Sequence, residues 1–116
     1  MSDKPKNVIN VNDLDLEGKS SEPIRVPAKG DGFITFPSPF EQDAEKTEEL
    51  LSLIYSEGMQ QGRITPALKK WLTADDYAKF RKAYPTYRAS LTVFQAVTER
   101  MEASYGSLGE DTASES

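Results

Sequence analysis

The sequence contains no cysteine and no histidine, and both absences limit what the protein can do. Without cysteine there is no disulfide, no thiolate metal ligand and no thiol nucleophile. Without histidine the chain lacks the side chain that most often acts as a base near neutral pH. An enzyme that uses carboxylates alone remains an alternative, but the composition favours a small protein that binds other molecules.

Long apolar runs are also missing. No stretch approaches the ~18 apolar residues that a membrane helix needs, and the polar residues 1–7 lead into nothing that resembles a signal peptide. The absence of cysteine fits a reducing compartment. We therefore expect a cytoplasmic protein without a membrane segment.

The net charge of −5 is unevenly distributed along the 116 residues. Residues 1–22 and 106–116 carry the excess of acids, so residues 23–105 sum to zero. Within this neutral part, residues 41–57 have a net charge of −5 and residues 63–88 have one of +5. Opposite charges on two successive segments favour contact between them, within one molecule or between copies.

Both ends of the chain differ in composition from its middle. In residues 1–22 the apolar side chains are scattered among polar ones, which indicates a flexible leader. Residues 107–116 are rich in Ser, Glu, Asp and Thr and predict a disordered acidic tail. Between them we expect one domain, residues 23–106.

The first part of this domain predicts a β-hairpin. Ile24-Arg25-Val26 alternates, and Phe33-Ile34-Thr35-Phe36 is β-branched and aromatic. Gly30-Asp31-Gly32 between them is typical of a turn, and it lacks the glycine and lysine that complete a phosphate-binding loop. Prolines on both sides of each run keep the strands short.

The rest of the domain predicts about four helices, spanning residues 43–57, 65–72, 74–84 and 87–104. Gly58 and Gly62 would end the first helix. Thr65 would cap the second, with Pro66 at its first position, while Thr73 and Thr86 would cap the third and fourth. The expected fold class is mainly α with a short N-terminal β-hairpin, a small α+β domain.

A corner between the second and third helices supplies the largest apolar group, Trp71-Leu72. The last helix carries a continuous apolar stripe, formed by Leu91, Phe94, Val97, Met101 and Tyr105. We expect Trp71 and Leu72 to be buried against this stripe, near Phe94 and Val97.

The acidic residues do not predict a catalytic or metal site. Asp75 and Asp76 lie in the first turn of a helix, where carboxylates suit the positive end of the helix dipole. Glu45 and Glu49 share a helix face, but a divalent cation needs more oxygen ligands than two side chains provide. We expect no catalytic residue, no metal and no cofactor.

Residues 63–88 mix bases with aromatic side chains, a composition suited to phosphate contacts and base stacking. The aromatic residues Trp71, Tyr77, Phe80 and Tyr84 follow helical spacing, however, which favours a place in the core. Nucleic-acid binding through residues 63–88 is therefore the alternative function, and a solvated or protein-facing basic surface is preferred.

Three sequence segments occur in an order that is similar to the order found in a known protein family. They are Phe33-Ile34-Thr35-Phe36-Pro37-Ser38-Pro39-Phe40, followed by the acidic helix, Trp71-Leu72-Thr73-Ala74-Asp75-Asp76-Tyr77, and the closing Val97-Thr98-Glu99-Arg100-Met101-Glu102-Ala103-Ser104-Tyr105-Gly106. Over residues 24–106 the chain resembles tail assembly chaperones of long-tailed, siphovirus-type phages of actinobacteria.

The resemblance implies a protein that is not an enzyme and binds the tape measure protein, a very long helical polypeptide. It would keep this client soluble in the host cytoplasm until tail-tube subunits polymerise, and it would be absent from the mature virion. A chain ending in a loose tail would be the short, non-frameshifted form. A longer frameshifted form of the chain is then a further partner, and a homo-oligomer stays open.

A chaperone for an amphipathic helix needs an exposed apolar groove edged by charge. The preferred face is the acidic helix, where the apolar residues spread over more of the circumference than one packing partner buries. Its predicted contacts are Leu50, Leu53, Ile54 and Tyr55, flanked by Glu45 and Glu49. The second candidate is the exposed side of the last helix, at Val93 and Val97.

Overall fold

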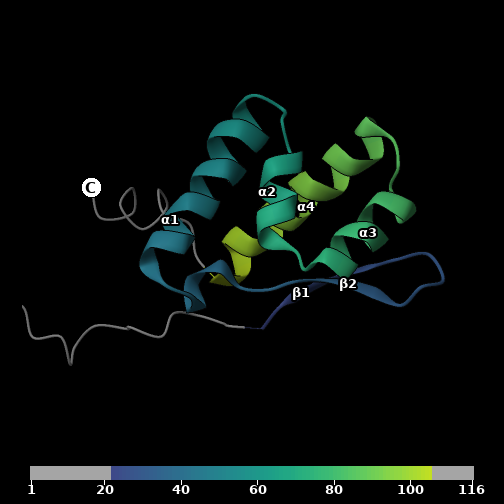
Figure 1. The fold of residues 1–116 in the computed structure, drawn as a ribbon, viewed down its shortest axis with the longest axis horizontal. Coiled ribbons are helices and arrows are strands. Elements are labelled where there is room, and N and C mark those ends of the chain that lie inside the picture. Colours follow the sequence, from purple (N-terminus) through teal and green to yellow (C-terminus); the bar gives the residue numbers. More distant parts are fainter. Residues whose placement is uncertain (1–21, 106–116) are drawn as a thin grey trace, which may run out of the picture.

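The computed structural model describes residues 22–105. This part is mainly α with an N-terminal two-stranded hairpin, as the sequence predicts (Figure 1). In chain order the elements are β1 (Ile24–Pro27), β2 (Phe33–Phe36), η2 (Pro39–Glu41), α1 (Ala44–Ser52), η3 (Leu53–Gln60), α2 (Thr65–Trp71), α3 (Ala74–Ala83) and α4 (Tyr87–Tyr105). The predicted leader before Glu22 and the predicted tail lie outside the described residues. None of the helices in the described part is long and apolar enough to cross a membrane.

The hairpin pairs β1 with β2 in antiparallel register, with Ile24 opposite Phe36 and Val26 opposite Ile34. Its turn contains Gly30 and Gly32 at φ angles of 97° and 77°, which glycine adopts without strain. Ile34 and Phe36 are fully buried, whereas Phe33 on the other face of β2 is exposed. The alternation of β2 therefore places one face of the hairpin on the helices.

The first helix differs from the prediction in length and in type. It does not end at Gly58; after Ser52 it continues as a π-helix to Gln60. Gly58 lies inside this π-helix and is buried, because its missing side chain lets the ring of Phe94 approach the backbone. The helix ends just before Gly62, the second glycine predicted to end it, whose φ of 73° is the left-handed conformation typical of a helix C-terminus.

Two of the three predicted helix caps are confirmed. The Thr73 hydroxyl accepts from the Asp76 N–H at 3.1 Å, and the Thr86 hydroxyl accepts from the Ala89 N–H at 3.1 Å. The third is wrong: Ile64 occupies the cap position, because the Leu68 N–H donates to the Ile64 carbonyl at 2.9 Å. Thr65 lies inside the first turn, and its hydroxyl accepts from Arg81 instead.

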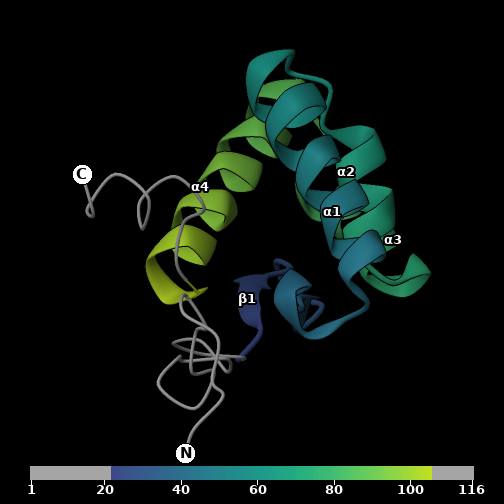
Figure 2. The same ribbon diagram turned by 90° about the vertical axis from the view of Figure 1, so that its left-hand side faces the viewer.

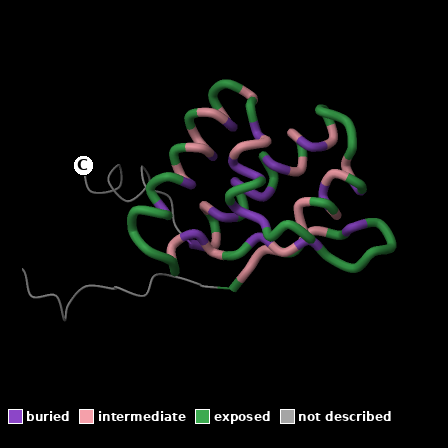
Figure 3. Tube along the Cα trace, viewed as in Figure 1, coloured by how far each residue is buried: buried purple, intermediate pink, exposed green. Residues whose placement is uncertain are grey.

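Trp71 joins the hairpin to the helices at the centre of the core. Its ring meets Phe36 edge to face at a centroid distance of 5.0 Å and Phe94 at 6.5 Å, and its Nε1–H donates to the Pro37 carbonyl at 2.8 Å. Trp71, Leu72, Phe94 and Val97 are all buried, which confirms the predicted corner. Figure 3 shows the buried positions on the inner sides of the helices and of the hairpin.

The C-terminal half of α4 stands apart from the other helices, whereas Phe94 in its N-terminal half packs against Gly58 and Trp71. Figure 2 shows α1, α2 and α3 grouped together, α4 on the opposite side, and β1 at the base between them. Along the chain, β2 contacts α3 whereas β1 contacts α4. The outer edge of β1 therefore faces α4, and these two elements line an apolar opening on the surface.

Candidate functional site

The candidate site is a groove between β1 and α4, which we call the β1–α4 groove. One part of it is a hollow of about 260 Å³ with almost only apolar atoms in its wall. Its lining comes from both elements: Ile24 and Val26 of β1, and Thr92, Val93, Ala96, Val97 and Arg100 of α4. This composition suits an apolar side chain or a short stretch of apolar peptide.

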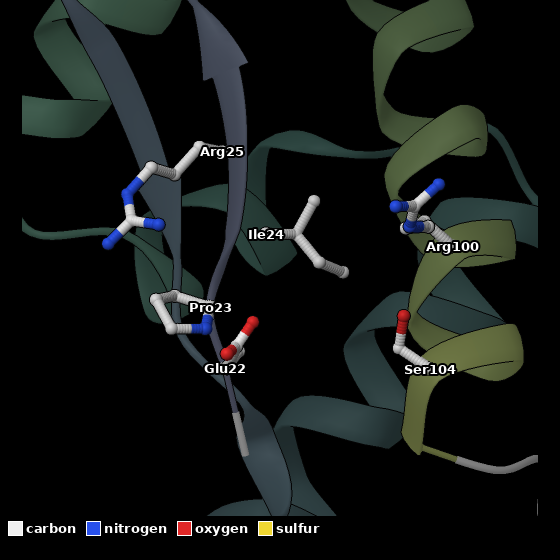
Figure 4. A pocket seen from close by; sticks show the side chains of 6 residues that line it. All are labelled: Glu22, Pro23, Ile24, Arg25, Arg100 and Ser104. Atoms are coloured by element: carbon white, nitrogen blue, oxygen red, sulfur yellow. The ribbon is translucent and has the colours of Figure 1, made fainter. Parts of the chain in front are cut away.

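A second hollow of about 370 Å³ continues the groove towards the end of α4. It shares Ile24 and Arg100 with the first and adds Glu22, Pro23, Arg25 and Ser104 (Figure 4). Figure 4 shows the Ile24 side chain pointing from β1 towards α4, with Arg100 opposite it on the helix. The groove is thus apolar at one end and polar at the other, and Arg100 lies where the two parts meet.

The sequence pattern explains why the groove forms here. Val93, Ala96, Val97 and Arg100 follow the spacing i, i+3, i+4, i+7, so they occupy one face of α4. Val97 is only 2% exposed and forms the floor, while Ala96 is exposed. The small side chain of Ala96 leaves a hollow that a larger residue would fill.

Two tyrosines hold β1 in place beside the helices. The Tyr84 hydroxyl donates to the Pro27 carbonyl at 2.6 Å, and the Tyr105 hydroxyl donates to the Glu22 carbonyl. Burial, followed by the nearby Glu22 carboxylate, raises the pKa of the Tyr105 phenol. Tyr105 therefore stays a hydrogen-bond donor at neutral pH, and both ends of β1 are fixed.

The client-binding face predicted on the acidic helix is not exposed as the sequence suggested. Leu50 and Ile54 are 2% and 0% exposed, so neither side chain can contact a partner in this conformation. Leu53 and Tyr55 are half-buried, and both pack against the core. The core therefore takes up most of the apolar surface that was predicted to be free for a client.

Tyr55 also has a partner within the molecule. Its hydroxyl donates to the Glu102 carboxylate of α4 at 2.7 Å. Burial and, after it, the hydrogen bond to Glu102 raise the pKa of the Tyr55 phenol. This side chain links η3 to α4 and contributes to the fold.

The two predicted flanking carboxylates are exposed. Glu49 forms an ion pair with Lys70 of α2, which is a contact between the acidic and the basic segments within one molecule. Glu45 lies one turn earlier on the exposed face of α1. No group of three or more acidic side chains in residues 22–105 is placed to hold a metal ion.

Asp75 and Asp76 lie in the first turn of α3, the position assigned from the sequence. Asp76 has a second role there, because its Oδ2 accepts from the Thr35 N–H of β2 at 3.4 Å. This contact links the first turn of α3 to the hairpin.

An open pocket of about 550 Å³ lies where α2 and α4 begin and α3 ends; we call it the Arg81 pocket. Its lining includes Arg63, Thr65, Pro66, Arg81, Pro85 and Tyr87. The Arg81 guanidinium donates from Nε to the Tyr77 hydroxyl at 3.0 Å, from Nη1 to the Ser90 hydroxyl at 3.3 Å and from Nη2 to the Thr65 hydroxyl. Sequence patterns did not reveal this arrangement, because its residues come from three helices.

The basic residues of 63–88 do not form one continuous strip. Lys70 pairs with Glu49, and Arg63 lies 3.6 Å from Glu57. The Lys69 ammonium lies 5.8 Å from the centre of the Tyr77 ring, within the ~6 Å of a cation–π contact. Lys79 and Lys82 line a different hollow, which Asp31 and Asp75 share. This dispersion gives no specific support to nucleic-acid binding.

Sequence patterns did not identify several of the residues that line the groove. Val93 and Val97 belong to the second predicted face, but Ile24, Val26, Ala96 and Arg100 were not assigned to a site. The spacing of residues 93, 96, 97 and 100 was the available signal, whereas the partner strand could not be recognised without the fold.

Comparison with protein-family models, with curated proteins and with solved structures found no match for this chain, so its surfaces must be interpreted from their own geometry.

Proposed function

We propose that this protein is a non-enzymatic chaperone that binds a segment of a long amphipathic helix in the β1–α4 groove. The resemblance to tail assembly chaperones names the client as the tape measure protein, which this chain would keep soluble in the host cytoplasm during tail morphogenesis. The observation that carries the proposal is the apolar wall of the groove, formed by Ile24, Val26, Val93, Ala96 and Val97.

The length of the groove suits a helical client. Its α4 side extends from Thr92 to Ser104, which is about 18 Å at 1.5 Å per residue. An amphipathic helix binds such a groove through residues at i, i+3, i+4 and i+7, so two or three client turns would fit. Contacts of this kind are numerous and individually weak, which suits a chaperone that must later release its client.

The charge at the groove indicates which client segments bind best. Arg100 lines both hollows and is exposed to solvent. A carboxylate on the client helix would meet this guanidinium next to the apolar wall, and a bidentate pair would fix its register. The favoured segments are therefore apolar on one face with an acidic residue beside it, in contrast to the lysine-rich segments that the acidic helix would attract.

The test is co-expression with a tape measure protein, the long helical client that the resemblance implies. Wild-type protein is expected to keep this client soluble. Ala96→Glu places a carboxylate in the apolar part of the groove and is expected to abolish the effect. Gln95→Glu adds the same charge at the neighbouring exposed position, which does not line the groove, and is expected to leave the effect intact. Equal rescue by both variants would remove the groove from consideration.

A further inference from the structure

Arg81 carries a positive charge that its neighbours do not neutralise. The side chain is half-buried, and its three recorded acceptors are the hydroxyls of Tyr77, Ser90 and Thr65. Among the described residues, no carboxylate forms a salt bridge with it. Partial burial of a cation with only neutral acceptors is costly, because neutral hydrogen bonds replace water without compensating the charge.

The three hydroxyls also fix the orientation of the guanidinium. Ser90 is fully buried and donates its own proton to the Tyr84 carbonyl at 2.6 Å, so its oxygen is oriented to accept from Arg81. The Tyr77 ring lies 5.3 Å from the guanidinium carbon. A guanidinium has five N–H donors, and three are used here, which leaves one each on Nη1 and Nη2. These two donors can bind a carboxylate of a ligand.

Other residues around Arg81 complete a binding site. The Arg81 pocket also contains Arg63, which is 67% exposed, and its remaining wall includes Pro66, Pro85 and Tyr87. The Tyr87 side chain is 60% exposed, yet its hydroxyl donates to the Gly62 carbonyl at 2.9 Å, which holds the ring at the rim of the pocket. Cations and apolar groups in one wall complement an acidic residue that is flanked by apolar ones.

We propose that the Arg81 pocket binds a carboxylate of an acidic peptide segment, with Arg81 as its primary contact. Arg63 is a second cation, because its exposed pair with Glu57 at 3.6 Å is weak enough to be exchanged for a ligand. This site is separate from the β1–α4 groove and does not depend on the function proposed above. A peptide is favoured over nucleic acid because the pocket presents one oriented guanidinium within a mainly apolar wall, whereas phosphate backbones are bound by rows of bases. The lysines of this region lie elsewhere, as described above.

The experiment uses the full chain and two tripeptides. N-acetyl-leucyl-glutamyl-leucinamide is titrated into isotope-labelled protein, and the signals of the Arg81 Nε–H and of the Gly62 and Thr65 backbone amides are followed by NMR. We expect saturable shifts at these three signals. The same peptide with glutamine in place of glutamate is expected to bind about tenfold more weakly, because it loses a charged hydrogen-bonded pair.

Matched variants separate the pocket from general electrostatic attraction. Arg63→Gln is expected to weaken binding of the glutamate peptide several-fold. Arg88→Gln removes the same charge from an exposed position that does not line the pocket, and it is expected to leave the affinity unchanged. Arg81 itself is kept, because its hydrogen bonds join three helices and its loss would disturb the fold.

Three results would overturn the proposal. The first is equal affinity for the glutamate and glutamine peptides, and the second is the absence of any saturable shift at the three signals. The third is a short DNA duplex that shifts the same signals at lower concentration than the peptide, which would assign the pocket to nucleic acid. All three results are measured on the wild-type protein, so none of them depends on whether a variant folds.

Discussion

The ring of Phe94 lies directly against the backbone of Gly58. A Cβ atom added at Gly58 would be 2.7 Å from Cζ and 2.8 Å from Cε2 of this ring, closer than non-bonded carbon atoms approach. Phe94 is fully buried, and it also meets the ring of Trp71. This contact fixes the distance between η3 and α4. It also lets the first helix continue past Gly58, the first of the two glycines predicted to end it.

Replacing Gly58 by alanine is therefore expected to destabilise the protein, although alanine is the better helix former. Phe94 cannot move outwards without disturbing Trp71, so the added methyl group should reduce the free energy of unfolding by about 1–3 kcal/mol. Urea denaturation measures this difference. Ser56→Ala, at an exposed position of the same helix, serves as control and should change the value by less than about 0.5 kcal/mol. A stabilised Gly58→Ala variant would contradict the packing described here.

Trp71→Ala is expected to cost about 3–5 kcal/mol, because it leaves a cavity between the hairpin and α4 and removes the hydrogen bond to Pro37. A loss of this size unfolds many domains of this length. Phe33→Ala provides the comparison, since this aromatic side chain is 57% exposed. Thermal melts of the two variants should differ clearly, and an unchanged melting temperature for Trp71→Ala would place the indole outside the core.

The raised pKa of the Tyr55 phenol predicts that the folded protein loses stability at high pH. In the unfolded chain a tyrosine loses its proton near pH 10, whereas burial and Glu102 raise the pKa of Tyr55 in the folded protein. Above pH 10 the unfolded state therefore binds fewer protons than the folded state, and unfolding becomes more favourable. We expect the free energy of unfolding to fall as pH rises from about 10.

Tyr55→Phe isolates this contribution from that of the lysines, which titrate in the same range. The variant should lose stability less steeply than the wild type between about pH 10 and 11, as measured by urea denaturation at each pH. Equal slopes for the two proteins would mean that Tyr55 is solvated and does not depend on Glu102.

The ion pair between Glu49 and Lys70 is exposed, so its energetic contribution should be small. Lys70→Gln is expected to reduce the free energy of unfolding by less than about 1 kcal/mol at low salt. The difference should shrink further as salt is added, because exposed charges are screened. A larger, salt-independent loss would show that Lys70 has a structural role beyond this pair.

Local signals in the sequence predicted much of the fold. The alternation of residues 24–26 and 33–36 gave the hairpin, and Thr73 and Thr86 marked the starts of α3 and α4 correctly. These features depend on neighbours within a few residues. The burial of Trp71 against Phe94 also followed from their size and spacing.

Features that depend on distant residues were not predictable in the same way. The close contact between Gly58 and Phe94 joins residues 36 positions apart, and Tyr55 bonds to Glu102, 47 positions away. The groove likewise depends on the position of β1 beside α4. No pattern within either segment alone specifies that pairing.

Site-specific photo-crosslinking tests the central claim most directly, because it distinguishes the two faces that the sequence left as candidates. A photoreactive phenylalanine analogue is placed either at Ala96, in the β1–α4 groove, or at Glu45, on the exposed face of α1. Each protein is irradiated in cells that also express the tape-measure-like client. Our account predicts a crosslink to the client from position 96 and none from position 45. A crosslink from position 45 alone would contradict it and would assign client binding to the acidic helix.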